Sequence, residues 1–427
     1  MTLISPIYVG DDALANLLRY CAEKQLTRFT LVSDTNTHRA LGARVTDALR
    51  AEGYHVTPIV LDGDEIIADE RYLTTVLVNA PLEPSTFLAV GAGTLTDITR
   101  FISHRMGRKF ISLPTAPSVD GFTSIGAPLV LNLVKHTVVS QAPIALFADL
   151  TTLREAPHRL IAAGYGDMIG KITSLADWHL GSVVWDEPFD AAIYKRSEAA
   201  IERCISHTET IGQHSAEGVR HLIEALIDSG LCMLDFGDSR PASGAEHHAS
   251  HYWEMLLLQQ GRPAALHGAK VGFALTLVAR QYEKIRALSR AEMRQRLAAA
   301  TLPDRDAEVA AIRQGYGIVA EDVARAHAPF LDMSQAQFDA IKQRIENRWD
   351  AIQQIAAKVP PPEQIAGYLE RVGAPTNGAA LGLTDDEVAR GLEYAHYLRS
   401  RFTVMKLSRV LGIPLSERLG LRSLEAS

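Results

Sequence analysis

Apolar and polar positions follow two periods in the first third of the chain. Apolar residues three or four apart, typical of amphipathic helices, alternate with short apolar runs that are typical of buried strands. The predicted helices cover Asp11–Lys24, Leu41–Glu52, Asp69–Asn79 and a segment that follows Gly91-Ala-Gly-Thr94 and runs through His104. The predicted strands cover Arg28–Ser33, Tyr54–Leu61, Ser85–Val90 and Lys109–Leu113. Because alternating strands and helices favour parallel pairing, we expect a Rossmann-like α/β sheet with helices on both faces.

After Asp149 the strand-like runs become rare and helical spacing dominates. The predicted helices there cover Leu160–Leu180, Pro188–Ile211, Ala216–Cys232, His247–Gln259, His267–Arg286, Ala287–Ala299 and Asp385–Leu411. Proline-containing segments at 303–306 and 360–363 predict breaks between helices. We therefore expect an α/β domain over residues 1–150 and an all-α domain over 151–427, and a chain of 427 residues favours two domains.

The composition narrows the class of protein. Hydrophobic residues make up 47% and charged residues 22%, as in a globular protein, and a net charge of −7 without a basic stripe argues against nucleic-acid binding. Three scattered cysteines fit a reducing cytoplasm, and the first residues lack the features of a signal peptide. The longest apolar run, near Ile125–Val134, contains Pro128 and Asn132, so we expect no membrane span.

Two segments at the predicted sheet edge have the composition of ligand-binding loops. Gly91-Ala-Gly-Thr94 joins a strand to a helix, where glycines and free N–H groups suit a phosphate, although a structural turn is an equal alternative. Asp34 follows another strand and suits a ribose hydroxyl, with a helix N-cap as the slightly favoured alternative. In the loop 114–124, Asp120 lies in a stiff segment rich in hydroxyl groups. This favours a functional loop over a turn whose polar side chains have no role.

Histidines are concentrated after a Pro/Ser/Gly turn. On a helix from Ala245, His247 and His251 share one face and His248 points about 100° away. Imidazoles are common ligands of zinc and nickel, while a solvent-facing helix start capped by Ser243 is the alternative.

Two distant residues extend this set. Asp167 lies near an apolar helix start, as an oxygen ligand or a cap, whereas Asp177 on the same helix has a structural interpretation. His267 precedes another helix, where a core histidine is the alternative. Asp167, His247 and His267 together would leave coordination positions open, as a catalytic divalent metal requires.

With these motifs together, the chain resembles the superfamily of metal-dependent polyol dehydrogenases, which includes glycerol dehydrogenases, iron-containing alcohol dehydrogenases and dehydroquinate synthases. Within it the chain looks most like the bacterial sn-glycerol-1-phosphate dehydrogenase family. The resemblance rests on three segments, 114–124, Ala163-Gly-Tyr-Gly-Asp167 and 239–255, and covers residues 1–290 best.

The resemblance implies a site and a reaction. The implied metal ligands are Asp167, His247 and His267. The implied substrate contacts are Asp120, Asp167 and His251. The implied cofactor contacts, together with Asp34, are Gly91, Gly93, Thr94, Leu95, Thr96, Asp97, Thr115, Ser118 and Ser124. The implied reaction is NAD(P)H-dependent reduction of dihydroxyacetone phosphate with Zn²⁺ or Ni²⁺, in a cytoplasmic homodimer.

Some features depart from the family or leave alternatives. Ala92 stands where many relatives have a third glycine, and the region Ala287–Phe330 has no recognisable counterpart. Arg240, Lys171 and Lys270 are candidates for a substrate phosphate, although each is expected to be a surface or helix-end charge. The alternative functions are dehydrogenation of an unphosphorylated polyol such as glycerol, and a non-catalytic NAD-binding regulator; dehydroquinate synthase fits less well.

Overall fold

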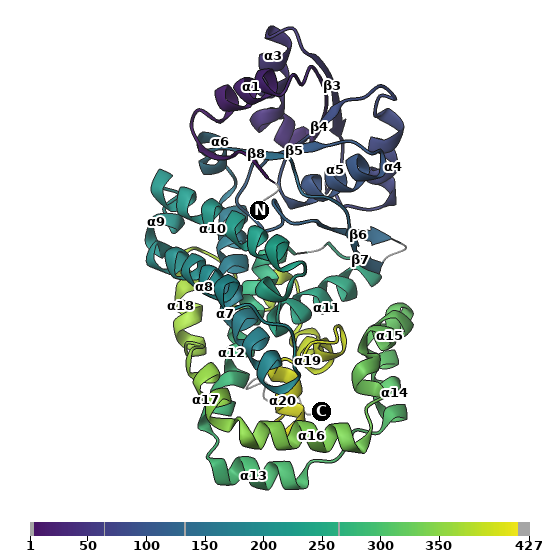
Figure 1. Cartoon of the computed structure of the whole chain (residues 1–427), viewed down its shortest axis with the longest axis vertical. Helices are drawn as coiled ribbons and strands as arrows, with labels where there is room; N and C mark the ends of the chain where they lie inside the picture. Colours follow the sequence, from purple (N-terminus) through teal and green to yellow (C-terminus); the bar gives the residue numbers. More distant parts are fainter. Residues whose placement is uncertain (1–3, 64, 132–133, 264, 417–427) are drawn as a thin grey trace, which may run out of the picture. The chain divides into compact units, whose positions relative to one another are not determined.

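A computed structural model describes residues 4–63, 65–131, 134–263 and 265–416 (Figure 1). These residues divide into two compact units. The first comprises the chain up to Ile169 with Lys195–Ser239 and Arg371–Ala374, and the second comprises Gly170–Tyr194, Arg240–Glu370 and the chain from Pro375. The change from alternating to helical structure near residue 150 and the division into compact units therefore fall at different places.

The first unit contains a six-stranded parallel sheet in the order β1-β8-β5-β4-β2-β3. The strands are β1 (Ile7–Gly10), β2 (Arg28–Asp34), β3 (His55–Leu61), β4 (Thr86–Val90), β5 (Phe110–Leu113) and β8 (Ala145–Asp149). The parallel α/β prediction is confirmed, and the four strands foreseen from the pattern are present within one residue at each end.

Successive side chains of the strands point to opposite faces, and helices cover both faces (Figure 1). Leu88 and Val90 of β4 pack with residues of α1 (Ala13–Glu23) and α3 (Ala43–Ala51). Phe87 and Ala89 pack on the other face with α4 (Glu70–Asn79) and α5 (Gly93–Arg105). The predicted helix over Leu41–Glu52 differs at its start, where a π-helical turn, η1 (His38–Gly42), precedes α3.

The sequence pattern missed β1, β8 and an antiparallel hairpin formed by β6 (Gly126–Leu131) and β7 (Val134–Val139). The apolar run that was weighed as a membrane segment is largely this hairpin. Ala127 and Leu129 of β6 pack into the core beneath α4 and α5. No helix among the described residues is long and apolar enough to cross a membrane.

The remaining described elements are helical, as predicted for the chain after Asp149. Those up to residue 242 are α6 (Leu150–Arg154), α7 (His158–Val184), α8 (Ala191–Ser206), α9 (Thr208–Gly212), α10 (Ala216–Phe236) and η2 (Arg240–Ala242), with the short α2 (Thr35–Thr37) before them. The predicted helix over Pro188–Ile211 is thus two helices, because the chain leaves the helical path at His207.

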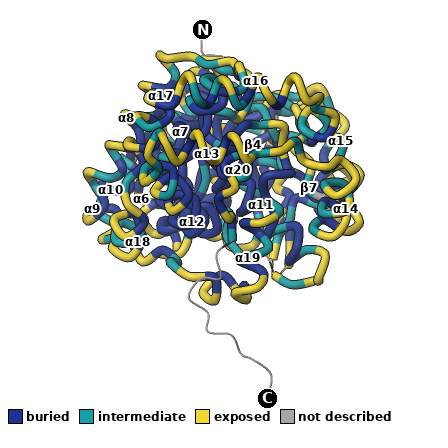
Figure 2. Tube along the Cα trace, turned by 90° about the horizontal axis from the view of Figure 1, so that it is seen from below, coloured by how far each residue is buried: buried dark blue, intermediate teal, exposed yellow. Residues whose placement is uncertain are grey.

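The second unit is built around α12 (His267–Ala287), most of whose residues are buried (dark blue in Figure 2). It packs against α11 (Ala245–Gln259), α17 (Trp349–Ala357) and α20 (Val404–Val410). The other helices are α13 (Arg290–Ala299), α14 (Arg305–Tyr316), η3 (Gly317–Val319), α15 (Ala320–Leu331), α16 (Gln335–Asn347), α18 (Pro362–Arg371), η4 (Ala379–Leu381), α19 (Asp385–Tyr394) and η5 (Ala395–Tyr397).

Candidate active site

The first turn of α11 holds a buried carboxylate beside a buried imidazole. Glu246 is fully buried and accepts hydrogen bonds from the hydroxyls of Thr173 (2.6 Å) and Ser174 (2.5 Å) on α7. It also accepts one from the backbone N–H of Gly244 (2.8 Å). Its Oε1 lies 2.7 Å from Nδ1 of His247. The alternative of a solvent-facing helix start is therefore wrong, and so is the Ser243 cap, since Gly244 is the N-cap residue.

The contact between Glu246 and His247 fixes the role of the imidazole. Burial alone would raise the pKa of Glu246, but the hydrogen bond and charge of His247, with the hydroxyls of Ser174 and Thr173, lower it to about 2. Glu246 is therefore a carboxylate that only accepts hydrogen bonds, and His247 must donate through Nδ1–H. When the ring is neutral, its lone pair is on Nε2, as in histidines that ligate a metal and donate their other N–H to a carboxylate. This arrangement fits a divalent ion.

Replacing Glu246 by glutamine is expected to weaken binding of the ion by about 10- to 100-fold, the usual effect of losing such a carboxylate. The side chain keeps its size, while the charge that holds the His247 tautomer is lost. Titration of the metal-free protein with Zn²⁺ measures the change, and Glu363→Gln, on an exposed residue of α18, is the control. Equal affinities in the two variants would show that Glu246 does not support the ligand.

Three of the predicted histidines lie together in the second unit. The ring of His247 is centred 5.2 Å from that of His267 at the start of α12 and 6.2 Å from that of His251. The rings of His251 and His267 are stacked 5.4 Å apart. His267 is half-buried, so the alternative of a core histidine is wrong. His248 points elsewhere, and burial, together with the charges of Arg401 and Lys406, keeps its pKa well below the usual value.

Two charged residues lie beside these histidines: Glu254, which the sequence prediction missed, and Lys270, which it named as a candidate for the substrate phosphate. Glu254 lies one turn after His251, and their ligand atoms belong with His267 to a group that could hold a metal ion. Nζ of Lys270 lies 3.1 Å from Oε2 of Glu254, and Lys270 is 1% exposed. The expectation that Lys270 and Lys171 are surface or helix-end charges is wrong, because both are buried.

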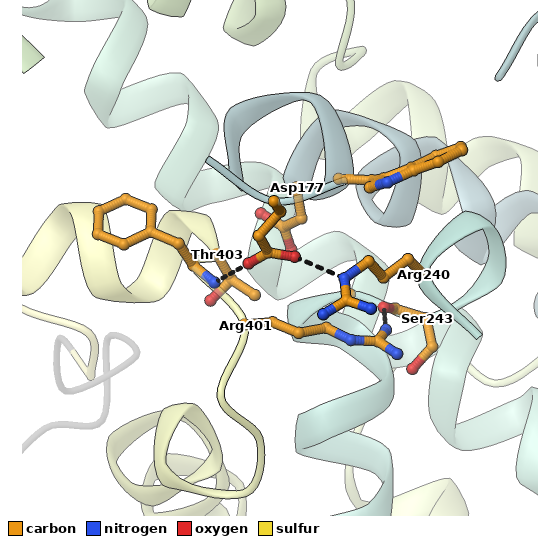
Figure 3. A pocket seen from close by; sticks show the side chains of 9 residues that line it. Asp177, Arg240, Ser243, Arg401 and Thr403 are labelled. Atoms are coloured by element: carbon orange, nitrogen blue, oxygen red, sulfur yellow. Dashed lines mark hydrogen bonds and ion pairs between the residues drawn. The ribbon is translucent and has the colours of Figure 1, made fainter. Parts of the chain in front are cut away.

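Asp177 supports the start of α11, and Arg240 lies in the same small pocket. Asp177 accepts hydrogen bonds from the backbone N–H groups of Ala245 (2.7 Å) and Val404 (2.7 Å) and from the hydroxyl of Tyr282 (2.6 Å). Its structural interpretation is confirmed. Figure 3 shows Asp177 in a small pocket with Arg240, whose Nε lies 2.9 Å from Glu187. Arg240 therefore forms an ion pair with Glu187.

In the first unit, the loop after β5 places Asp120 beside Asp167. The backbone N–H of Asp120 donates to Oδ2 of Asp167 (3.0 Å), and its side chain accepts a hydrogen bond from Ser229 of α10 (2.8 Å). Asp167 is fully buried in the middle of α7, so the cap alternative is wrong. Thr115, Ser118 and Ser124 are also buried.

The loop is fixed by Arg100, which the sequence prediction did not single out, and by Gly164, which lies in the segment Ala163-Gly-Tyr-Gly-Asp167 that it did. Arg100 of α5 is buried and donates to the backbone oxygens of Gly121 (2.5 Å) and Gly126 (2.8 Å), while it pairs with Asp97 (2.7 Å). Gly164 of α7 lies directly against the loop, because a Cβ there would be 1.7 Å from the carbonyl oxygen of Pro117. Arg100 and Gly164 are positioning residues for Asp120.

The turn that begins with Gly91-Ala-Gly-Thr94, here called the glycine turn, lies next to this loop. The backbone N–H of Thr115 donates to the oxygen of Gly91 (3.4 Å), and a Cβ on Gly93 would lie 2.8 Å from Val119. Gly93 thus has a packing role. The N-cap of α5 is Ala92, which has no capping side-chain hydrogen bond among the described residues. Phosphate binding by Gly91, Gly93, Thr94, Leu95, Thr96 and Asp97 stays a prediction.

Asp34 has the structural role that was slightly favoured. Its side chain accepts a hydrogen bond from the backbone N–H of Thr37 (2.7 Å), and the Thr37 hydroxyl bonds back to the Asp34 N–H (2.9 Å). These contacts form a capping box at α2. A ribose contact by Asp34 stays a prediction.

The chain is similar to known proteins over most of its length. The model of the family "Iron-containing alcohol dehydrogenase" matches residues 8–157. The glycerol-1-phosphate dehydrogenase [NAD(P)+] of Geobacillus thermodenitrificans is 38% identical over 94% of this chain and 91% of its own length. The protein of the same name from Bacillus subtilis is 37% identical over 95% of this chain and 91% of its own. The chain belongs to the glycerol-1-phosphate dehydrogenase family. The likeness therefore extends well beyond residue 290.

Solved structures show the same fold. Glycerol dehydrogenase from Schizosaccharomyces pombe superposes with a TM-score of 0.61 at 17% identity. The match covers 95% of this chain and 88% of the glycerol dehydrogenase. An alcohol dehydrogenase from Oenococcus oeni has a TM-score of 0.61 at 14% identity, covering 96% of this chain and 98% of its own. The combination of a parallel α/β part and a helical part is thus shared with these dehydrogenases.

Proposed function

We propose that this protein catalyses the reversible reduction of dihydroxyacetone phosphate by NAD(P)H to sn-glycerol 1-phosphate, with one divalent metal ion. The proposal rests on relatives named for glycerol-1-phosphate dehydrogenase, which match this chain almost end to end at 37–38% identity. The observation that carries the metal requirement is the hydrogen bond between His247 Nδ1 and the buried Glu246 carboxylate.

The proposed ligands of the ion are Asp167, His247 and His267. His247 and His267 are neighbours in the second unit. Asp167 lies on α7, seven residues before Ser174, which bonds Glu246. Residues seven apart share a helix face, so Asp167 lies on the same face of α7 as Ser174. One carboxylate and two imidazoles suit zinc or nickel.

When bound, the ion would act as a Lewis acid toward the C2 oxygen of the substrate, and NAD(P)H would supply the hydride. The chain's own residues hold the reactants. We assign Asp120 and His251 to hydrogen bonds with substrate hydroxyls and to proton transfer at the C2 oxygen. Asp34, the glycine turn from Gly91 to Asp97, and Thr115, Ser118 and Ser124 are assigned to the cofactor.

The phosphate group of the substrate needs a cation. Lys270 is buried near His251 and His267 through its contact with Glu254, and Lys171 is buried on α7 four residues after Asp167. We propose these two lysines for the phosphate because Lys270 lies beside the site histidines and Lys171 lies one turn after Asp167, whereas Arg240 lies in another pocket with Asp177 and Glu187. A homodimer and a cytoplasmic location stay predictions.

A comparison of two ketones tests the function. With NADH or NADPH and Zn²⁺ or Ni²⁺, we expect kcat/KM for dihydroxyacetone phosphate to exceed that for dihydroxyacetone by at least about 100-fold, because a charged hydrogen bond or ion pair is worth roughly 2–3 kcal/mol. Absorbance of the reduced cofactor follows the reaction. A preference for dihydroxyacetone would indicate a polyol dehydrogenase, and no cofactor oxidation with either ketone would indicate a non-catalytic relative.

A further inference from the structure

A second set of metal-type ligands lies on the first unit, outside the candidate active site. His207 follows α8, and Glu217 and His221 lie one turn apart on the same face of α10. The ligand atoms of these three residues lie within 4.8 Å of one another. Ser229, which bonds Asp120, is eight residues further along α10, or about 12 Å.

The two imidazoles face one carboxylate oxygen. Nε2 of His207 is 3.9 Å and Nε2 of His221 is 4.0 Å from Oε1 of Glu217, and the rings are centred 3.8 Å apart. These separations are too long for hydrogen bonds. Two ligand atoms of a tetrahedral ion with bonds near 2.1 Å lie roughly 3.4 Å apart. The two Nε2–Oε1 distances are longer than this by about half an ångström. Small rotations of these partly exposed side chains would close that difference.

The orientation of His207 is already that of a ligand. Its Nδ1 lies 2.8 Å from the backbone oxygen of Arg203, and a carbonyl oxygen only accepts, so Nδ1 carries the proton. The lone pair is then on Nε2, which faces Glu217. The buried Nδ1 of His221 has no hydrogen-bond partner among the described residues, so the ring, which packs against His207, is not fixed by a hydrogen bond from that nitrogen.

The backbone that carries the three residues is held in place independently of them. Ser215 caps α10 by accepting a hydrogen bond from the backbone N–H of Gly218 (3.0 Å). A Cβ on Gly218 would lie 2.3 Å from the backbone of Thr210, so α9 packs directly on the first turn of α10. Because this backbone is already ordered, binding of an ion would cost less conformational entropy.

We propose that His207, Glu217 and His221 form a second binding site for a borderline divalent ion such as Zn²⁺ or Ni²⁺. Two imidazoles and one carboxylate match the ligand preference of these ions, and water fills the remaining positions. The ion joins the end of α8 to the start of α10, the helix that supports Asp120 through Ser229. It is thus a structural ion, separate from the one required for activity.

Zn²⁺ binding to the full chain tests the proposal. In a His247→Ala/His267→Ala background, equilibrium dialysis with elemental analysis is expected to find one Zn²⁺ per chain. Adding His221→Asn should weaken that binding by at least 10-fold, whereas adding His104→Asn, on an exposed residue of α5, should leave it unchanged. Absence of Zn²⁺ from the folded background variant, or equal binding after His221→Asn, would overturn the proposal.

A second measurement tests the site if the His247→Ala/His267→Ala protein does not fold. In the otherwise unaltered protein, His221→Asn is expected to lower bound Zn²⁺ from two ions per chain to one and to keep its kcat with dihydroxyacetone phosphate. One ion in both proteins would refute the second site, whatever the activity. Loss of the activity with two ions still bound would also refute it. An inactive protein that binds two ions, one of them lost with His221→Asn, would support this site and contradict the proposed function alone.

Discussion

Substitution of His247 by alanine is expected to lower kcat/KM for dihydroxyacetone phosphate by about 10³-fold or more and to remove one bound metal ion per chain. The variant loses a proposed ligand and leaves Glu246 buried without its imidazole partner. Loss of a Lewis acid removes several kcal/mol of transition-state stabilisation, and each 1.36 kcal/mol is a factor of ten in rate. Steady-state kinetics with elemental analysis measures both effects.

The control for this prediction is His104→Ala, which removes an exposed histidine from α5. Circular dichroism should show the same helical content for both variants. If His247→Ala retained full activity and its metal while remaining folded, His247 would leave the ligand set and the catalytic role of the ion would need another explanation.

The second large effect is expected at Gly164. A Cβ at this position would lie 1.7 Å from the carbonyl oxygen of Pro117, so Gly164→Ala must displace the loop that carries Ser118 and Asp120. A shift of about 1 Å in a reacting group costs roughly 100-fold in rate, and we expect a loss of kcat/KM of that order. Kinetics alongside denaturant unfolding separates misplacement of the loop from loss of stability.

Gly367→Ala on α18 is the matched control, because nothing lies within 4 Å of a Cβ at that glycine. Alanine is the better helix former, so this variant should gain about 0.5–1 kcal/mol of stability with unchanged kinetics. Wild-type kinetics and stability for Gly164→Ala would show that the loop does not depend on its contact with α7.

Periodicity predicted the parallel sheet well where each strand was a long apolar run beside an amphipathic helix, as in β2 and β4. It missed β8, which is as short and as buried as β4 but follows the β6–β7 hairpin instead of an amphipathic helix, so no alternation of strand and helix marked it. The β6–β7 hairpin was missed because its apolar residues were considered only as a membrane segment. The cores beneath α4 and α5 depend on that hairpin and are not apparent from local pattern.

The candidate site was predictable where residues share a helix. His247, His251 and Glu254 follow helical spacing, so Glu254 was recognisable from the sequence although it was overlooked. The burial of Lys270 was not, since it depends on how other helices, among them α11, pack on α12. Nor does the sequence show that Arg100 holds the loop, because its partners are backbone oxygens more than twenty residues away.

The ligand set of the ion is the central claim. Crystals of the protein soaked in Zn²⁺ and measured above and below the zinc absorption edge would locate the ion directly. The account predicts an anomalous peak bounded by a carboxylate oxygen of Asp167 and by Nε2 of His247, with the ring of His267 as the third ligand. The absence of a peak beside Asp167, His247 and His267 would contradict it, whether or not a second peak lies at His207, Glu217 and His221.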